Sequence, residues 1–116
     1  MNLNEYQELA ARTINNDLFE PEKIMHALHG MVGEIGEIHA IFQKNYQGHE
    51  LEPEHLKKEL GDLLWFIAEF CTAGEKQFGC DWSLENIARM NIEKLKARYP
   101  DGFDAEHSLH RKADDI

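Results

Sequence analysis

Four carboxylates fall into two pairs, and the members of each pair are three positions apart. Glu34 and Glu37 form the first pair, and Glu59 and Asp62 form the second. Residues at this spacing share one face of a helix, with their Cβ atoms roughly 5–6 Å apart. Two such helices packed together would bring the carboxylates into one small space, where protonation or a bound cation must relieve their repulsion. Because all the ligand atoms would be oxygens, magnesium, manganese or calcium is the expected cation.

The residues around the pairs distinguish them from an ordinary acidic surface. In a chain with 22 acidic residues, an isolated pair is usually a solvated face. Here Glu34 and Glu37 lie within MVGEIGEI, and no Lys or Arg follows until Lys44. Asp62 directly precedes the apolar run LLWFIA. Carboxylates without a basic partner at the edge of a core are costly unless they bind a metal, so we expect both pairs to supply metal ligands.

Apolar residues at three- and four-residue steps predict an all-α fold whose four main helices form a bundle. The expected helices begin at Asn2 or Asn4, Pro21, Pro53 and Ser83 and end near Asn16, Gln43, Lys76 and Pro100. The carboxylate pairs then belong to the second and third helices. Residues 1–100 form the expected helical domain, and residues 101–116 form a tail that is loosely ordered or packed on a neighbouring subunit.

Two glycines interrupt the second expected helix, next to the first carboxylate pair. They are Gly33 and Gly36, and each Gly in a helix interior costs about 1 kcal/mol relative to Ala. A close approach of another helix or of a bulky ligand to the backbone would compensate for this cost, and we favour the ligand.

Composition and charge exclude several classes of function. The formal net charge of −10 argues against a surface for a nucleic acid polymer, which needs clustered Lys and Arg. We expect neither a signal peptide nor a membrane span, because no basic start precedes an apolar run and no stretch approaches roughly 20 apolar residues. Cys71 and Cys80 form no metal motif, so we expect two reduced core thiols in a cytoplasmic protein.

The length of the chain and one of its helices favour self-association. A chain of 116 residues buries only about two-thirds of its surface alone. Residues 60–70 are apolar nearly all round, which places them at the centre of the bundle or in an interface between subunits. We therefore expect a homodimer or a dimer of dimers, that is, a homotetramer.

Three separated segments carry a resemblance to a known family. They are GEIGEI, ELGDLLWFIA and NIEKLKARYPDGF, and twenty-one residues separate the carboxylate pair of the first from that of the second. In order and spacing they resemble the MazG-type nucleotide pyrophosphohydrolases, of the all-α nucleoside triphosphate pyrophosphatase superfamily. The resemblance covers roughly residues 3–104 as a single MazG unit, so it implies that the helical domain is catalytic.

The resemblance implies hydrolysis of a nucleoside triphosphate between its α- and β-phosphates, which gives a monophosphate and pyrophosphate. It also implies Mg²⁺, for which Mn²⁺ would substitute, with these ligands: Glu34, Glu37, Glu59 and Asp62. Such ions would bind the phosphate oxygens and lower the pKa of an attacking water. The catalytic residues are assigned as Glu37, our choice of general base through that water, and Glu34. Housekeeping of nucleotide pools is the implied role, and we favour deoxynucleotides as substrates.

Cationic residues on the fourth expected helix would meet the phosphates. Asn91, Lys94 and Arg98 lie at i, i+3 and i+7, and Tyr99 follows. On its own this stripe would be a solvated basic face. With the resemblance of NIEKLKARYP, Lys94 and Arg98 are expected phosphate ligands, since arginine suits two parallel bonds to phosphate. Asn91 would bond to phosphate or to metal-bound water, and Tyr99 is assigned to the same substrate site.

Several other side chains have both a structural and a functional interpretation. His29 shares a helix face with the first carboxylate pair, and we favour a neutral structural role over base stacking or proton transfer at the substrate site. Trp65 and Phe66 are expected in the core. Tyr6 and Gln7 could close over the nucleotide base.

Two other functional classes and one other substrate stand as alternatives. A di-iron bundle typically uses Glu-x-x-His on two helices, whereas the only such pair here, Glu52 and His55, straddles Pro53. A non-catalytic bundle could keep the metal site for stability or as an interaction module. Within the favoured class, phosphoribosyl-ATP or another nucleotide metabolite is the alternative substrate.

Overall fold

The computed structural model describes residues 1–112 and 115–116, and five helices lie in this part of the chain. They are α1 (Leu3–Ala11), α2 (Glu20–Tyr46), α3 (Pro53–Phe78), α4 (Leu84–Arg98) and α5 (Ala105–Leu109). No strand occurs among these residues, and none of their helices is long and apolar enough to cross a membrane. The predicted all-α fold with four main helices is confirmed, and α5 is an additional short helix within the tail.

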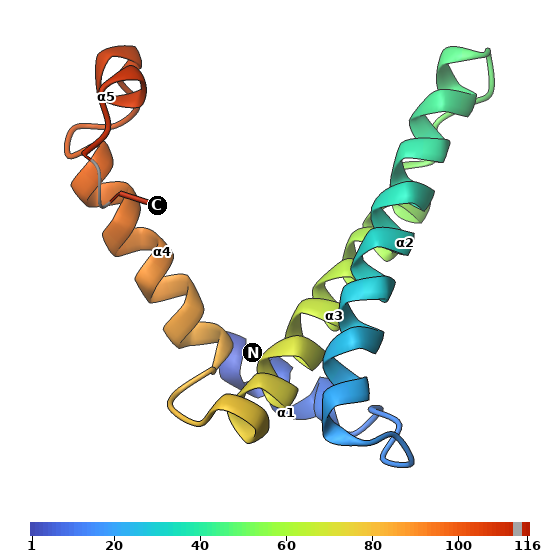
Figure 1. Cartoon of the computed structure of the whole chain (residues 1–116). Helices are drawn as coiled ribbons and strands as arrows, with labels where there is room; N and C mark the ends of the chain where they lie inside the picture. Colours follow the sequence, from blue (N-terminus) through green and yellow to red (C-terminus); the bar gives the residue numbers. More distant parts are fainter. Residues whose placement is uncertain (113–114) are drawn as a thin grey trace.

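The helices form the two arms of a V (Figure 1). The hairpin of α2 and α3 is one arm, α4 and α5 are the other, and α1 lies where the arms meet. The Cα radius of gyration is 17.4 Å, whereas a compact domain of this length has about 13 Å. Thus α4 extends away from α2 and α3 and does not complete a bundle with them inside one chain.

Capping residues and prolines set where the helices begin. The Asn2 side chain accepts a hydrogen bond from the Glu5 amide, and the Ser83 side chain accepts one from the Asn86 amide. Both α2 and α3 have a proline in the first turn, where an amide hydrogen is not needed. These starts agree with the sequence pattern to within one residue.

The first helix ends at Ala11, earlier than expected. The Thr13 hydroxyl donates to the Ala10 carbonyl at 2.8 Å, and the Asn15 side chain accepts from the Asp17 amide at 3.0 Å. Such local bonds between side chains and backbone compete with helix formation. They explain why the helix ends at Ala11 although the apolar periodicity of the sequence continues further.

The buried core lies where the two arms meet. One cluster of it is formed by apolar residues of α1, α3 and α4: Ala10, Ala68, Cys71 and Leu84. Ile24 and Ala27 of α2 are buried as well. Gln7, which is 8% exposed, links the same three helices. Its Nε2 donates to Thr72 Oγ1 at 3.3 Å, and its Oε1 accepts from the Leu84 amide at 2.7 Å. The prediction that Gln7 closes over a nucleotide base is therefore wrong, because the side chain is used within the core.

A hydrogen bond between the half-exposed His26 and the buried Glu69 joins α2 to α3. Glu69 is 1% exposed, and His26 Nδ1 lies 2.8 and 3.0 Å from its two carboxylate oxygens. The His26 ring packs against Trp65 and Phe66, at centroid distances of 6.4 and 5.7 Å. Trp65 Nε1 also donates to Thr13 Oγ1 at 2.7 Å. The predicted packing role of Trp65 and Phe66 is confirmed.

One glycine of α2 is required by packing, but it is not one that the sequence pattern indicated. A Cβ at Gly30 would overlap the ring of Phe66. A Cβ at Gly33 or Gly36 would have no atom of the described chain within 4 Å. No helix of the described chain therefore comes into contact at these two positions, and the approach of a ligand there stays a prediction.

The two cysteines lie in different environments. Cys71 is buried, and its burial raises the pKa of its thiol. Cys80 is exposed, so the prediction of a second core thiol is wrong. The physical reason is that α3 ends at Phe78, and Cys80 follows Gly79 in a turn with a φ of 65°.

Candidate functional site

The hairpin of α2 and α3 brings carboxylates from both helices together. One oxygen from each of Glu34, Glu59 and Asp62 lies within 4.8 Å of the others. Glu34 belongs to α2, and the i, i+3 spacing puts Glu59 and Asp62 on one face of α3. Glu34 and Glu59 are partly buried, and Asp62 is exposed. Three of the four predicted metal ligands therefore form one cluster, called the carboxylate cluster below.

Glu37 lies at the edge of the carboxylate cluster. It is exposed and does not belong to the group of three converging oxygens. A hydrogen bond with Glu59 is nevertheless the main reason that the pKa of Glu37 is raised, followed by the negative charge of Glu59. The fourth predicted carboxylate is thus close enough to interact with the cluster without being one of its converging ligands.

Contacts within the cluster shift the pKa values of Glu34 and Glu59 in opposite directions. A hydrogen bond with Glu59, burial and the negative charges of neighbouring carboxylates raise the pKa of Glu34 to about 7. The hydrogen bonds from Glu34 and Glu37 lower the pKa of Glu59, and His55 lowers it further. Opposite shifts of this kind are the expected response when like charges are held close together. A proton shared by these two residues is therefore more stable on Glu34 than on Glu59.

His55 supports the cluster although the sequence pattern gave it no part in this site. Its Nε2 lies 3.2 Å from Glu59 Oε1, one turn away on α3. The His55 side chain is 54% exposed and that of Glu59 only 15%, so the contact joins a solvent-exposed imidazole to a partly buried carboxylate. The i, i+4 spacing of the two residues was the signal that could have revealed this contact.

The carboxylate cluster has the free donor atoms that a divalent cation needs. Glu34 Oε2 and Glu59 Oε2 are buried and have no hydrogen-bond partner among the described residues. A buried acceptor without a partner is costly, and a bound cation would satisfy both oxygens. All the donors are oxygens, which suits Mg²⁺, Mn²⁺ or Ca²⁺. The residues present therefore fit a divalent metal ion.

The predicted phosphate ligands lie on the other arm of the V. Asn91, Lys94 and Arg98 line a cavity of about 690 Å³ formed by α4 and the segment that follows it. Tyr99 does not line this cavity, and its ring packs against Phe103 at a centroid distance of 5.4 Å. Within one chain, these residues are therefore separated from the carboxylate cluster (Figure 1).

One predicted substrate-site residue, His29, is exposed on α2, and several tail residues that the sequence pattern did not single out line the cavity. His29 is exposed on α2, and no hydrogen bond or ion pair of its side chain is found in the part of the chain that the structure describes. Four tail residues with no assigned function line the cavity beside α4: His107, His110, Arg111 and Lys112. Their concentration of basic and imidazole groups, in an otherwise acidic chain, was the signal for them.

One family matches most of the chain. No curated protein and no solved structure matches this chain. The family model of the MazG nucleotide pyrophosphohydrolase domain matches residues 19–103. This range includes both carboxylate pairs on the α2 and α3 hairpin and the cationic stripe of α4. The chain therefore belongs to the MazG nucleotide pyrophosphohydrolase family.

Proposed function

We propose that the protein is a Mg²⁺-dependent pyrophosphohydrolase that cleaves nucleoside triphosphates between the α- and β-phosphates. The products would be a nucleoside monophosphate and pyrophosphate. The observation that carries this proposal is the pair of buried oxygens, Glu34 Oε2 and Glu59 Oε2, without a partner in the described chain. Membership of the MazG family supports the substrate class. When bound, the metal would bind phosphate oxygens and lower the pKa of the attacking water.

The carboxylates would divide into metal ligands and a proton acceptor. Glu34, Glu59 and Asp62 would hold the cation, since their oxygens converge. Glu37 would accept a proton from the attacking water, because it is exposed at the edge of the cluster. Its raised pKa makes its carboxylate a stronger base than an ordinary glutamate. Glu37 would thus reach the metal through that water and not directly.

Two copies of the chain would complete the site. The carboxylate cluster and the predicted phosphate ligands lie on different arms (Figure 1), so a triphosphate bound by both needs α4 of a second copy beside the hairpin. Large apolar side chains on both arms are more than a third exposed: Val32, Ile35, Phe42, Leu60, Leu64, Ile87, Met90 and Leu95. Exposed apolar surface of this extent is typical of an interface. A homodimer or a dimer of dimers would bury it.

Product analysis tests the reaction. A panel of ribo- and deoxynucleoside triphosphates is incubated with Mg²⁺ or with a chelator. We expect wild type to give monophosphate and pyrophosphate with Mg²⁺ only, and Glu37→Gln to lose about 10²–10⁴-fold in rate. Glu50→Gln, at an exposed loop position, is the matched control and should keep the wild-type rate. Orthophosphate as the product would place the cut at the γ-phosphate and contradict the proposal.

The same panel ranks the substrates. We expect deoxynucleotides to be preferred, as suits cytoplasmic housekeeping of nucleotide pools. Faster turnover of phosphoribosyl-ATP would assign the site to a related nucleotide metabolite. Metal binding without turnover of any nucleotide would leave a non-catalytic bundle, in which the cluster serves stability or partner binding.

A further inference from the structure

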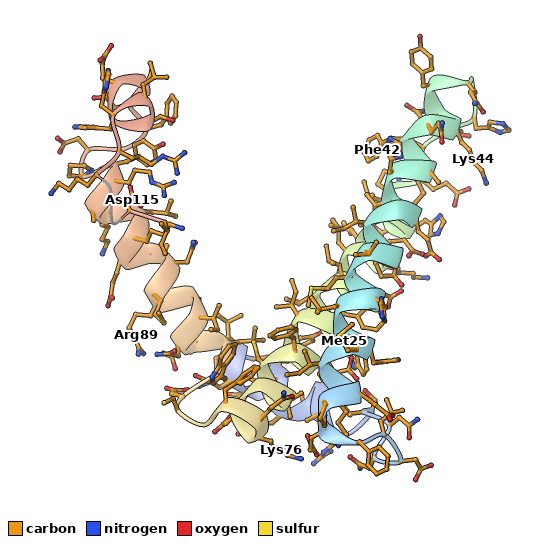
Figure 2. The ribbon with its side chains drawn as sticks, in the orientation of Figure 1. Met25, Phe42, Lys44, Lys76, Arg89 and Asp115 are labelled. Atoms are coloured by element: carbon orange, nitrogen blue, oxygen red, sulfur yellow. The ribbon has the colours of Figure 1, made fainter. Side chains whose placement is uncertain are left out.

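Among the described residues, Asp115 forms an ion pair with Arg98 of α4. Arg98 Nε donates to Asp115 Oδ2 at 2.8 Å, and Arg98 Nη2 donates to Asp115 Oδ1 at 2.7 Å. The two side chains are only 13% and 17% exposed, and Figure 2 shows Asp115 beside α4. Two parallel bonds to a pair of oxygens are also the geometry with which arginine binds a phosphate group. Asp115 therefore takes the place that an anion would occupy at Arg98.

The cavity beside this pair favours anions. Its lining includes basic and imidazole side chains from α4 and from the tail: Lys94, His107, His110, Arg111 and Lys112. Among the described lining residues, Asp115 is the only acidic one. In a chain with a net charge of −10, this is a local reversal of charge, and it favours the binding of a small polyanion.

The same cationic groups keep Asp115 ionised. The hydrogen bonds from Arg98 lower the pKa of Asp115, and the charges of Arg98, Arg111 and Lys94 lower it further. Asp115 in turn raises the pKa of Arg98. The contact at neutral pH is therefore between two full charges, and an incoming phosphate must compete with a carboxylate for the guanidinium group.

We propose that Asp115 is an internal competitor of the substrate phosphates: it occupies Arg98 in the ligand-free chain and is displaced when a pyrophosphate or triphosphate group enters the cavity. The inference rests on the proposed function, in which Arg98 is a phosphate ligand. After displacement, Arg111 and Lys112 stay beside the cavity and balance the added negative charge. The contact weakens the binding of substrate and of product pyrophosphate without taking part in hydrolysis.

Binding of inorganic pyrophosphate to the full-length protein tests this competition without turnover. Calorimetry in a chelator compares wild type with Asp115→Asn, which keeps the side-chain shape and removes its charge. We expect Asp115→Asn to bind pyrophosphate about three- to tenfold more tightly, the range expected for one partly buried ion pair. Asp101→Asn removes the same charge at an exposed position outside the cavity and should bind as wild type does.

Two further variants test whether the effect depends on Arg98 and on the carboxylate of Asp115. Arg98→Lys keeps a positive charge but loses the second bond, so Asp115→Asn should have a smaller effect in that background than in wild type. Asp115→Ala removes the same carboxylate and should reproduce the tighter binding. Pyrophosphate binding by Asp115→Asn that is unchanged or weaker, in a protein with the wild-type melting temperature, would overturn the inference.

The inference and the proposed function fail in distinguishable ways. Tighter pyrophosphate binding by Asp115→Asn, in a protein that hydrolyses no nucleotide, would support the internal competitor and overturn the proposed reaction. Metal-dependent hydrolysis, with the same pyrophosphate affinity in wild type and Asp115→Asn, would keep the reaction and overturn the competitor.

Discussion

The Glu34 carboxyl group links the site to the stability of the fold. Its pKa rises from an ordinary 4.5 to about 7 in the folded chain. Between these values the folded chain binds a proton that the unfolded chain has released. The free energy of unfolding of the metal-free protein therefore falls as the pH rises from about 4.5 to about 7. The lowered pKa of Glu59 acts with the opposite sign, but below this window.

Denaturant unfolding in a chelator, at pH 5 and at pH 7.5, measures this effect. The relevant quantity is the difference in stability between wild type and Glu34→Gln at each pH, because contributions from all other groups cancel in it. We expect Glu34→Gln to gain stability relative to wild type as the pH rises, because it lacks the charge that the cluster repels. A difference that does not depend on pH would show that Glu34 carries no unusual proton.

At the scale of residues, the sequence predicts contacts that follow helical spacing. The pairs Glu34–Glu37 and Glu59–Asp62 could be placed on helix faces because their separation matches one turn. The contact of Arg98 with Asp115 could not, because the chain reverses between them and no periodic pattern describes a tail. Site residues that the fold brings together from distant segments need the structure.

Within α2, two glycines allow the same substitution to be compared in a packed and in an open position. Gly30→Ala adds a methyl group that meets the Phe66 ring, so we expect a loss of about 1–3 kcal/mol in the free energy of unfolding. Gly33→Ala adds the same group into open space, so we expect a gain of up to about 1 kcal/mol from helix propensity. Chemical denaturation of the two variants measures both changes.

The activity of the same variants separates the possible roles of Gly33. If a bound ligand approaches the α2 backbone there, Gly33→Ala will be more stable than wild type and yet less active. A Gly33→Ala variant that is more stable and fully active would contradict the prediction that a ligand approaches the backbone there.

The existence and order of the main helices could be predicted from the sequence, but their packing partners could not. Apolar periodicity and the prolines at helix starts fix α2 and α3 almost completely. The need for glycine at position 30 depends on where Phe66 of α3 lies, which no local pattern reveals. Buried polar contacts, such as the hydrogen bond from the Leu84 amide to Gln7, likewise depend on how α1, α3 and α4 pack together.

For the whole molecule, the open V predicts an oligomer whose interface lies inside the V. A charge introduced on the inner face should dissociate this oligomer, and one on the outer face should not. Phe42 points toward the opening between the arms, and Lys44 lies on the outer side of the hairpin (Figure 2). Phe42 is 47% exposed in the single chain, and burying it in an interface would make a charge there costly. We expect Phe42→Glu to dissociate the oligomer and to lose activity, because α4 of the second copy no longer meets the carboxylate cluster.

Sedimentation of wild type, Phe42→Glu and Lys44→Glu at micromolar concentration measures this assembly. Lys44→Glu is the control on the outer face and should sediment as wild type does. A well-folded, active monomer of wild type would rule out the shared site.

The direction of α4 is the largest feature that the sequence could not predict. Its apolar stripe indicates that one face is covered, but an amphipathic pattern does not say whether the same chain or a second copy covers it. The exposed residues Met90 and Leu95 leave that face open in the single chain.

If the carboxylate cluster holds the cation that drives hydrolysis, metal binding and pyrophosphate release must depend on the same residues. A Mn²⁺ titration that records both on the same samples measures this dependence. At pH 8, where Glu34 is mostly ionised, we expect release from wild type to rise in proportion to the bound metal. Glu59→Gln should lose both binding and release. Pyrophosphate release by Glu59→Gln at the wild-type rate, or by wild type in a chelator, would show that the carboxylate cluster does not hold a catalytic cation.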